Sequence, residues 1–119
     1  NNEAKAYFGI QEMDISYSMR GAYDLPEGIY LRHVELDSPA MNAGMQNGDI
    51  LTGVEGEELN TYHDFILWLY DIEPGTTVNM TIKRQSVESY IEVECEVELG
   101  AVTYAIEQTE EEGNGNEIS

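Results

Sequence analysis

The stretch GIYLRHVELDSPAMNAGMQNGDIL, residues 28–51, changes its local pattern twice within a short length. Its first part, residues 28–36, is rich in β-branched and aromatic residues and predicts a strand. Ser38 suits the N-cap of a short helix, Pro39 its first position and Gly44 the residue after its end. We therefore expect a strand and a short helix here, with a second strand after them.

The sequence beyond this stretch continues to alternate between strands and helices. An Asn47-Gly48 turn precedes a strand over about residues 49–54, and a helix is expected over about residues 61–71. TVNMTIKR (77–84) and YIEVECEVEL (90–99) then alternate apolar and polar residues, which is typical of strands with one buried face. The alternation places Cys95 on the buried face, as a small hydrophobe, and a row of glutamates in solvent.

Upstream of the central stretch, AYFGIQEMDI (6–15) predicts a first strand over residues 7–15, followed by a polar loop to about Glu27. Gly9 stands between the large apolar residues Phe8 and Ile10, although glycine weakens a strand. One interpretation is a bulge or strand entry. The other is a close approach of the backbone by another part of the protein or by a ligand.

The predicted helix over residues 61–71 carries two apolar stripes at helical spacing. Phe65, Trp68 and Ile72 form the first stripe, which we expect to be buried. A second stripe, turned partly away from the first, consists of Tyr62, Ile66 and Leu69. The second stripe is either the edge of a wide core face or a surface that makes a separate contact.

Composition restricts the class of protein. The chain has 119 residues, enough for one domain, and 41% of them are hydrophobic, enough for a core. Its 24 acidic residues against 5 basic ones give a net charge of −19, which disfavours nucleic acids and anionic membranes. No signal peptide or bilayer-spanning stretch is present, and the abrupt start suggests an excised piece.

The chain lacks recognisable catalytic or metal-binding motifs. Its two histidines, His33 and His63, do not form part of a triad signature, and no serine lies in a Gly-x-Ser-x-Gly elbow. A single cysteine excludes an intrachain disulfide and the usual multi-cysteine zinc sites. We therefore expect no catalytic residues, no metal and no cofactor in this chain.

The order of the predicted elements resembles a PDZ domain over about Tyr7 to Leu99. YFGI (7–10) and residues 28–51 are similar to the PDZ domains of the HtrA/Deg family of serine proteases, in which the ligand loop opens the domain. The resemblance implies an α+β, mostly β fold: a partly open, five- to six-stranded antiparallel sandwich or barrel capped by two helices. Residues 1–6 would then be a linker remnant, 7–99 the PDZ domain and 100–119 an acidic, disordered tail.

The resemblance also implies a peptide-binding site. The amides of the ligand loop would hold a peptide's terminal carboxylate, Phe8 and Ile10 would line the pocket for its last side chain, and the strand from Ile10 to about Asp14 would pair with it. Lys5 would be the nearby positive charge, and His63 would lie on the surface beside the groove or contact a ligand. The implied peptide-binding residues are Tyr7, Phe8, Gly9, Ile10, Gln11, Glu12, Tyr62, Ile66 and Leu69.

The expected function is therefore a peptide-binding PDZ module of a bacterial HtrA-like, trypsin-like serine protease involved in protein quality control. Its partners would be C-terminal or extended peptides with apolar ends and the upstream protease domain, without nucleic acid or membrane contact. One alternative is an assembly or docking module, and another is the PDZ domain of a membrane-embedded or C-terminal-processing protease. The fragment itself is expected to be non-hydrolytic, and its parent protein to be extracytoplasmic, by family analogy.

Overall fold

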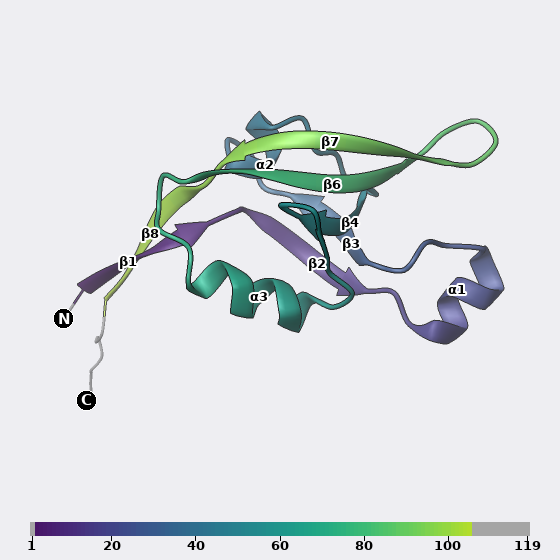
Figure 1. Cartoon of the computed structure of the whole chain (residues 1–119), viewed down its shortest axis with the longest axis horizontal. Helices are drawn as coiled ribbons and strands as arrows, with labels where there is room; N and C mark the ends of the chain where they lie inside the picture. The colour runs from purple at the N-terminus through teal and green to yellow at the C-terminus, as the bar shows by residue number, and fades with distance from the viewer. Residues whose placement is uncertain (1, 106–119) are drawn as a thin grey trace, which may run out of the picture.

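The computed structural model describes residues 2–105 and has a mostly β fold with antiparallel sheets (Figure 1). This confirms the expected fold class. The strands are β1 (Asn2–Tyr7), β2 (Ile10–Asp14), β3 (Ile29–Val34), β4 (Ile50–Val54), β5 (Glu57–Glu58), β6 (Thr77–Gln85), β7 (Tyr90–Glu98) and β8 (Gly100–Ala105). The helices are α1 (Tyr17–Tyr23), α2 (Pro39–Asn42) and α3 (Tyr62–Tyr70).

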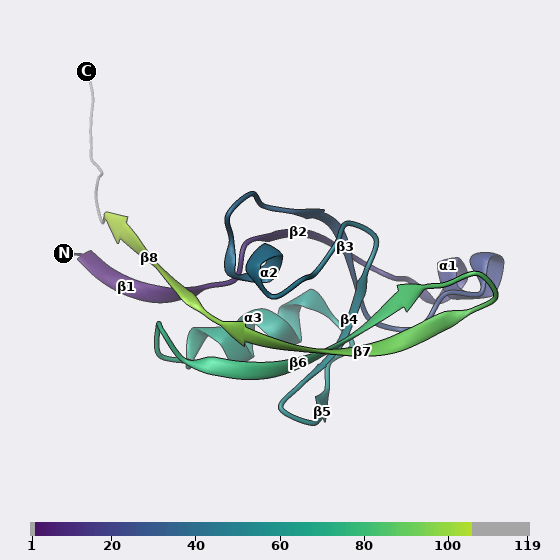
Figure 2. The same cartoon turned by 90° about the horizontal axis from the view of Figure 1, so that it is seen from above.

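The described strands form two sheets, and neither of these closes into a barrel. The larger sheet has the strand order β2-β3-β4-β6-β7, with β5 paired to β4, and β1 and β8 form a separate two-stranded ribbon. Helix α3 packs against both β1 and β2, and α2 packs against β7 (Figures 1 and 2). Strand β2 is therefore an edge strand of the larger sheet, with β3 on one side and α3 near the other.

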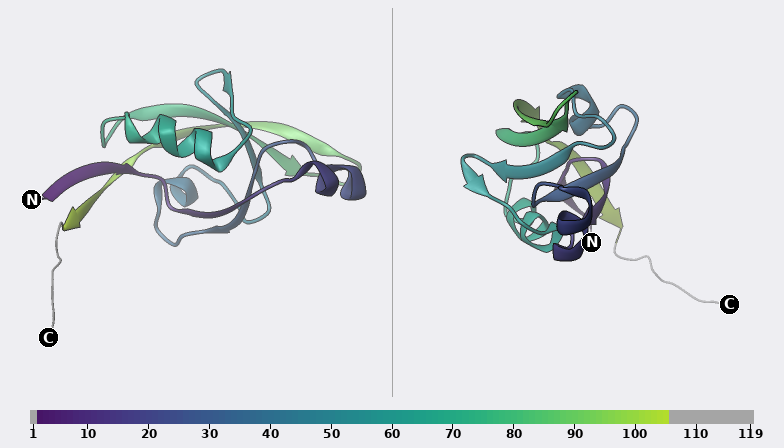
Figure 3. Two further views of the ribbon diagram at one scale, coloured as in Figure 1. Left: turned by 90° about the horizontal axis from the view of Figure 1, so that it is seen from below. Right: turned by 90° about the vertical axis from the view of Figure 1, so that its right-hand side faces the viewer.

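The core forms where the alternating strands face the helices. Val78, Met80 and Ile82 are buried on β6, and Cys95 and Val97 are buried on β7, as the period-two pattern predicted. Farther along β7 the burial weakens, because the β6–β7 hairpin extends beyond the core toward α1 (Figure 3). Burial raises the pKa of the Cys95 thiol above its ordinary value, because the charged thiolate is disfavoured away from water.

Helix α1 replaces part of the polar loop that the sequence predicted after β2. The hydroxyl of Ser16 caps its N-terminus by accepting a hydrogen bond from the N–H of Met19 at 3.1 Å. Asp24 ends it in the left-handed conformation, with a φ of 56°. The prediction missed α1 because the helix is only seven residues long and contains Gly21, so it shows no clear apolar periodicity. Residues 2–105 therefore contain three helices, where two were expected.

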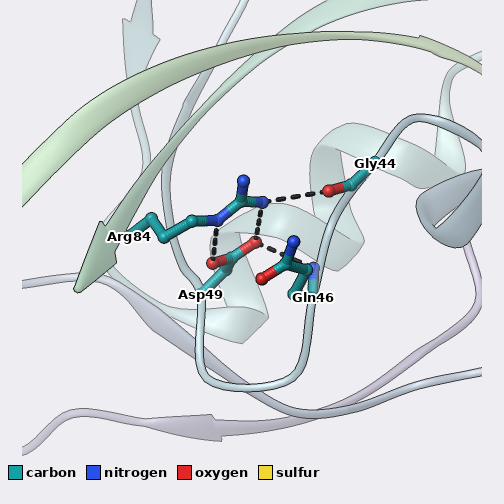
Figure 4. Close-up of polar contacts among 4 residues, drawn as sticks. All are labelled: Gly44, Gln46, Asp49 and Arg84. Atoms are coloured by element: carbon teal, nitrogen blue, oxygen red, sulfur yellow. Dashed lines mark hydrogen bonds and ion pairs between the residues drawn. The ribbon is translucent and has the colours of Figure 1, made fainter. Parts of the chain in front are cut away.

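A buried ion pair joins the β6–β7 hairpin to the turn before β4 (Figure 4). The Arg84 guanidinium donates two hydrogen bonds to the Asp49 carboxylate, at 2.9 and 2.7 Å, and a third to the carbonyl of Gly44 at 2.9 Å. The same carboxylate accepts the N–H of Gln46 at 2.8 Å. Asp49 raises the pKa of Arg84 further above its already high value, chiefly through the hydrogen bonds. The loop from Gly44 to Asp49 is thereby fastened to β6.

The β1–β8 ribbon lies outside the expected domain limits of residues 7 and 99. Its six register pairs run from Asn2 opposite Ala105 to Tyr7 opposite Gly100. Part of the predicted linker remnant and the first residues of the predicted tail are thus paired strands. The sequence did not indicate this, because a pairing between residues so far apart in the chain leaves no local signal. Residues 106–119 of the predicted tail lie outside the described residues.

We propose that the folded unit extends to Ala105, and two truncations test this limit. A chain ending at Ala105 is expected to melt within about 2 °C of the full chain, because all described pairs remain. A chain ending at Leu99 loses β8, leaves β1 unpaired and is expected to melt several degrees lower. Thermal melts followed by circular dichroism check this. Equal melting temperatures for the two truncations would contradict it.

Candidate functional site

The turn between β1 and β2 is fixed by its carbonyl groups. The carbonyl of Phe8 accepts a hydrogen bond from the N–H of Ala40 at 3.0 Å, and that of Gly9 accepts one from the N–H of Glu35 at 2.9 Å. In a trans peptide the N–H of the next residue points opposite to the carbonyl. The N–H groups of Gly9 and Ile10 therefore point away from α2 and β3. This orientation suits them to a ligand oxygen.

Gly9 is required at this turn for two reasons. Its φ of +94° lies in the region that residues with a Cβ avoid, and valine most of all. In addition, a Cβ at this position would overlap the side chain of Ser38. Ser38 is itself only 1% exposed, and its hydroxyl caps α2 by accepting the N–H of Met41 at 3.1 Å. Gly9 therefore stands at the entry to β2 and also lets the backbone approach the start of α2 closely. Both interpretations offered by the sequence, a strand entry and a close approach, apply to it.

A pocket of about 230 Å³ opens between this turn and α3. Seven of the nine residues implied by the family resemblance line it together, although they come from segments more than fifty residues apart. The lining consists of Ala6, Tyr7, Phe8, Gly9, Ile10, Glu35, Tyr62, Phe65, Ile66 and Leu69.

Of the first stripe of α3 only Phe65 is buried, whereas Trp68 and Ile72 are half-buried, so the expectation of a fully buried stripe was wrong for these two residues. Phe65 is 1% exposed and packs its ring against Phe8 at 5.3 Å and Trp68 at 5.8 Å, between ring centroids. The second stripe, Tyr62, Ile66 and Leu69, is only half-buried and lines the pocket. The extra apolar width of the helix therefore forms one wall of a groove. The free edge of β2 lies along the other.

At the end of the groove away from the Gly9 turn, a helix-capping hydrogen bond connects β2 to α3. The Asp14 carboxylate, at the end of β2, accepts the N–H of Tyr62 at 2.7 Å. Because Asp14 and Tyr62 are the end of one wall and the start of the other, this bond fixes the separation of β2 and α3. The groove is held open by the backbone at one end and by this contact at the other.

The remaining implied residues lie near the pocket without lining it. Gln11 is exposed on β2 and donates its side-chain N–H to the Glu35 carboxylate at 3.0 Å. Glu12 is half-buried, and its carbonyl accepts the Arg32 guanidinium at 3.2 Å. His63 is exposed and does not line the pocket, in agreement with the surface interpretation.

Lys5 occupies a neighbouring hollow rather than the carboxylate position. Its ammonium lies 4.1 Å from the centroid of the Tyr70 ring, an arrangement that favours a cation–π contact. This contact links β1 to the end of α3. The hollow, of about 280 Å³, shares Ala6, Ile66 and Leu69 with the main pocket. Lys5 therefore contributes positive charge near the groove.

Sequence reasoning missed three residues of the pocket: Ala6, Glu35 and Phe65. Phe65 was assigned to the core and serves both surfaces. Ala6 was placed just outside the first strand. Glu35 follows β3, and it reaches the pocket because its own N–H binds Gly9. No local pattern indicates such a position. It could have been found only by pairing β2 with β3 in register.

The part of the chain that the structure describes contains neither a cluster of metal-ligating side chains nor a bilayer-spanning helix. Among residues 2–105, no group of three His, Cys, Asp or Glu side chains is placed to hold a metal ion. No helix in the same range is long and apolar enough to cross a bilayer. The chemistry of the pocket is that of apolar side chains beside oriented backbone amides. Such a site binds its ligand by shape and hydrogen bonds.

The family model of the PDZ domain matches residues 6–95. The chain therefore belongs to the PDZ domain family. More particularly, its matched relatives are HtrA/Deg serine proteases, as the sequence resemblance predicted.

Three curated relatives illustrate the match. The serine protease Do-like HtrA of Bacillus subtilis (strain 168) is 38% identical over 94 residues, covering 71% of this chain and 21% of that protein. Its counterpart in Lactobacillus helveticus is 33% identical over 73 residues, covering 61% and 18%. The periplasmic pH-dependent serine endoprotease DegQ of Escherichia coli (strain K12) is 28% identical over 91 residues, covering 75% and 20%. The chain thus spans about a fifth of the length of these relatives.

Solved structures share the fold at low sequence identity. The HtrA3 PDZ domain bound to a phage-derived ligand, FGRWV, has a TM-score of 0.69 and 21% identity, covering 87% of this chain and 92% of that one. The HtrA-type protease AlgW with a decapeptide has a TM-score of 0.70 and 19% identity, covering 83% and 30%. The match covers nearly all of the isolated HtrA3 domain, so the shared fold is that of a complete PDZ domain.

Proposed function

We propose that this chain is a peptide-binding PDZ module that captures C-termini or extended segments of other proteins by strand addition. The observation that carries the proposal is the groove between the free edge of β2 and the second stripe of α3, with the Gly9 turn at one end. An edge strand offers unpaired N–H and C=O groups to an extended peptide. The apolar wall of α3 receives alternate side chains of that peptide.

The terminal carboxylate of the peptide binds at the Gly9 turn in this proposal. The N–H groups of Gly9 and Ile10 point away from the protein partners of the turn and, with that of Phe8, form the donor set. The last side chain enters the pocket lined by Ile10, Ile66 and Leu69, so an apolar end is preferred. The ligand of the HtrA3 PDZ domain, which ends in Trp-Val, agrees with this preference.

The host of the module, in this proposal, is an HtrA-like serine protease. The matched relatives are serine proteases, and the chain corresponds to about a fifth of their length. The catalytic residues belong to the remaining part of such a protein, and the module regulates them or delivers substrates to them. Relatives named as periplasmic support an extracytoplasmic parent protein.

Titration with C-terminal peptides tests the proposed function directly. A hexapeptide ending in valine is expected to bind with a Kd on the order of micromolar, since one strand and one pocket bury little area. Its amidated form lacks the negative oxygen that the turn amides recognise. We expect it to bind at least ten-fold more weakly. Equal affinity of the two forms would contradict the role of the carboxylate.

A pair of helix variants places this binding in the groove. Ile66→Glu puts a charge on the groove wall and is expected to remove measurable binding, because the carboxylate would be desolvated beside an apolar peptide side chain. Leu67→Glu is the matched control on the same helix, because Leu67 is 56% exposed and lies outside the pocket. Similar peptide affinities of the two variants would place the binding site elsewhere.

A further inference from the structure

We propose that Glu35 makes this groove selective for peptides with a basic residue, arginine or lysine, in the penultimate position. The inference rests on the proposed function, because it assumes an added strand along β2. It assigns the groove a class of positively charged ligands, which complements the negative charge of the protein.

The alternation of side chains in an added strand determines what the penultimate residue meets. The last side chain points into the apolar pocket, so the one before it points to the opposite face. On that face β2 and β3 present Gln11 and His33, which are register partners. Ile10 and Val34, the neighbouring pair, point to the inner side, where Val34 is buried. Glu35 follows two residues after His33, on the outer face, at the end nearest the Gly9 turn.

The Glu35 carboxylate is fixed at that place. Its backbone N–H is held by the Gly9 carbonyl at 2.9 Å, and one carboxylate oxygen accepts the Gln11 amide at 3.0 Å. The other oxygen lies 3.8 Å from the Nε2 atom of His33. A carboxylate has about four acceptor positions, so these neighbours leave positions for a guanidinium or ammonium group. The side chain is 38% exposed, so a ligand can reach it from the outer face.

The charge of the whole protein reinforces this local preference. Twenty-four acidic residues against 5 basic ones give a field that attracts cationic ligands and opposes acidic ones. The general field does not favour any one position of the peptide, whereas Glu35 favours a positive charge at the penultimate position. A penultimate arginine therefore gains a short-range ion pair, and a penultimate glutamate meets repulsion from the same carboxylate.

Three peptides that differ only in the penultimate residue test the proposal. Arginine, alanine and glutamate versions of one valine-terminated hexapeptide are titrated into the wild-type chain at pH 8 and low salt. The arginine peptide is expected to bind about five-fold more tightly than the alanine peptide, as befits a partly exposed charged pair. The glutamate peptide should bind most weakly. Raising the salt to about 0.5 M should bring the three affinities together, because salt screens exposed charges.

Substitution of Glu35 separates this local effect from the general field. Glu35→Gln keeps the shape and should reduce the ratio of arginine to alanine affinity to about one. Glu57→Gln, an equal change of net charge at an exposed residue of β5, should leave the ratio unchanged. An unchanged ratio of arginine to alanine affinity in Glu35→Gln would overturn the role of Glu35 but not the proposed function. Equal binding of all three peptides to the wild type would do the same. Failure of all three peptides to bind the wild type would overturn the proposed function and this inference with it.

Discussion

Gly9→Val is expected to remove measurable peptide binding and to destabilise the domain. The φ of +94° forces a β-branched residue into a strained conformation, which costs about 1–3 kcal/mol. The new side chain would also overlap Ser38, which is buried and caps α2, so the turn and the helix must move apart. The total loss of unfolding free energy should reach about 3 kcal/mol and lower the melting temperature by roughly 10 °C. The Phe8-Gly9-Ile10 motif alone does not indicate this loss of stability, because the contact between Gly9 and Ser38 has no local signature in the sequence.

Two alanine variants separate backbone strain from overlap at Gly9. Gly44 has the same φ of +94°, but a Cβ added there meets nothing within 4 Å. Gly44→Ala therefore reports the strain, and Gly9→Ala reports the strain together with the overlap. Chemical denaturation should show the larger loss for Gly9→Ala, and peptide titration should show weaker binding for that variant alone. If Gly9→Val binds peptide normally, the turn has no part in recognition.

Arg84→Met is expected to cause the second large effect, on stability. The substitution leaves the Asp49 carboxylate, whose side chain is 3% exposed, without its cation. Removing one partner of a buried ion pair costs about 3–5 kcal/mol, because the remaining charge is poorly solvated. The attachment of the β6–β7 hairpin to the turn before β4 is lost as well. Urea denaturation measures this loss as a decrease in the midpoint concentration.

Two further variants make this prediction specific to the buried pair. Lys83→Met removes a neighbouring positive charge from the same strand and should change the unfolding free energy by less than about 1 kcal/mol. The double variant Asp49→Asn/Arg84→Met removes the unpaired charge and keeps a side-chain acceptor for the N–H of Gln46. It should therefore recover part of the stability lost in Arg84→Met. Equal losses for Lys83→Met and Arg84→Met would show that the pair contributes no more than a surface charge.

The parts of the fold with strong local patterns were predictable from the sequence. The alternation on β6 and β7, the Ser38-Pro39 start of α2 and the periodicity of α3 each follow from the geometry of a single element. The same locality explains most of the candidate site. The Phe8-Gly9-Ile10 turn and the second stripe of α3 are visible as short motifs.

The features that escaped prediction depend on contacts between distant segments. The β1–β8 ribbon pairs residues about a hundred positions apart, and Glu35 reaches the pocket through a bond to Gly9. Helix α1 escaped for the opposite reason, because it is short and has weak intrinsic preference. The structure at the ribbon and at Glu35 is therefore determined by pairing between distant segments, which the local sequence does not reveal.

The register of the β1–β8 ribbon also determines where the two ends of the described chain lie. Asn2 and Ala105 face each other at one extremity of the molecule, and the turn from β1 into β2 follows the opposite end of this ribbon (Figure 1). Asn2 and Ala105, the two ends of the described chain, therefore lie side by side. A pulling force applied at Asn2 therefore acts first on β1, the strand that ends two residues before Gly9.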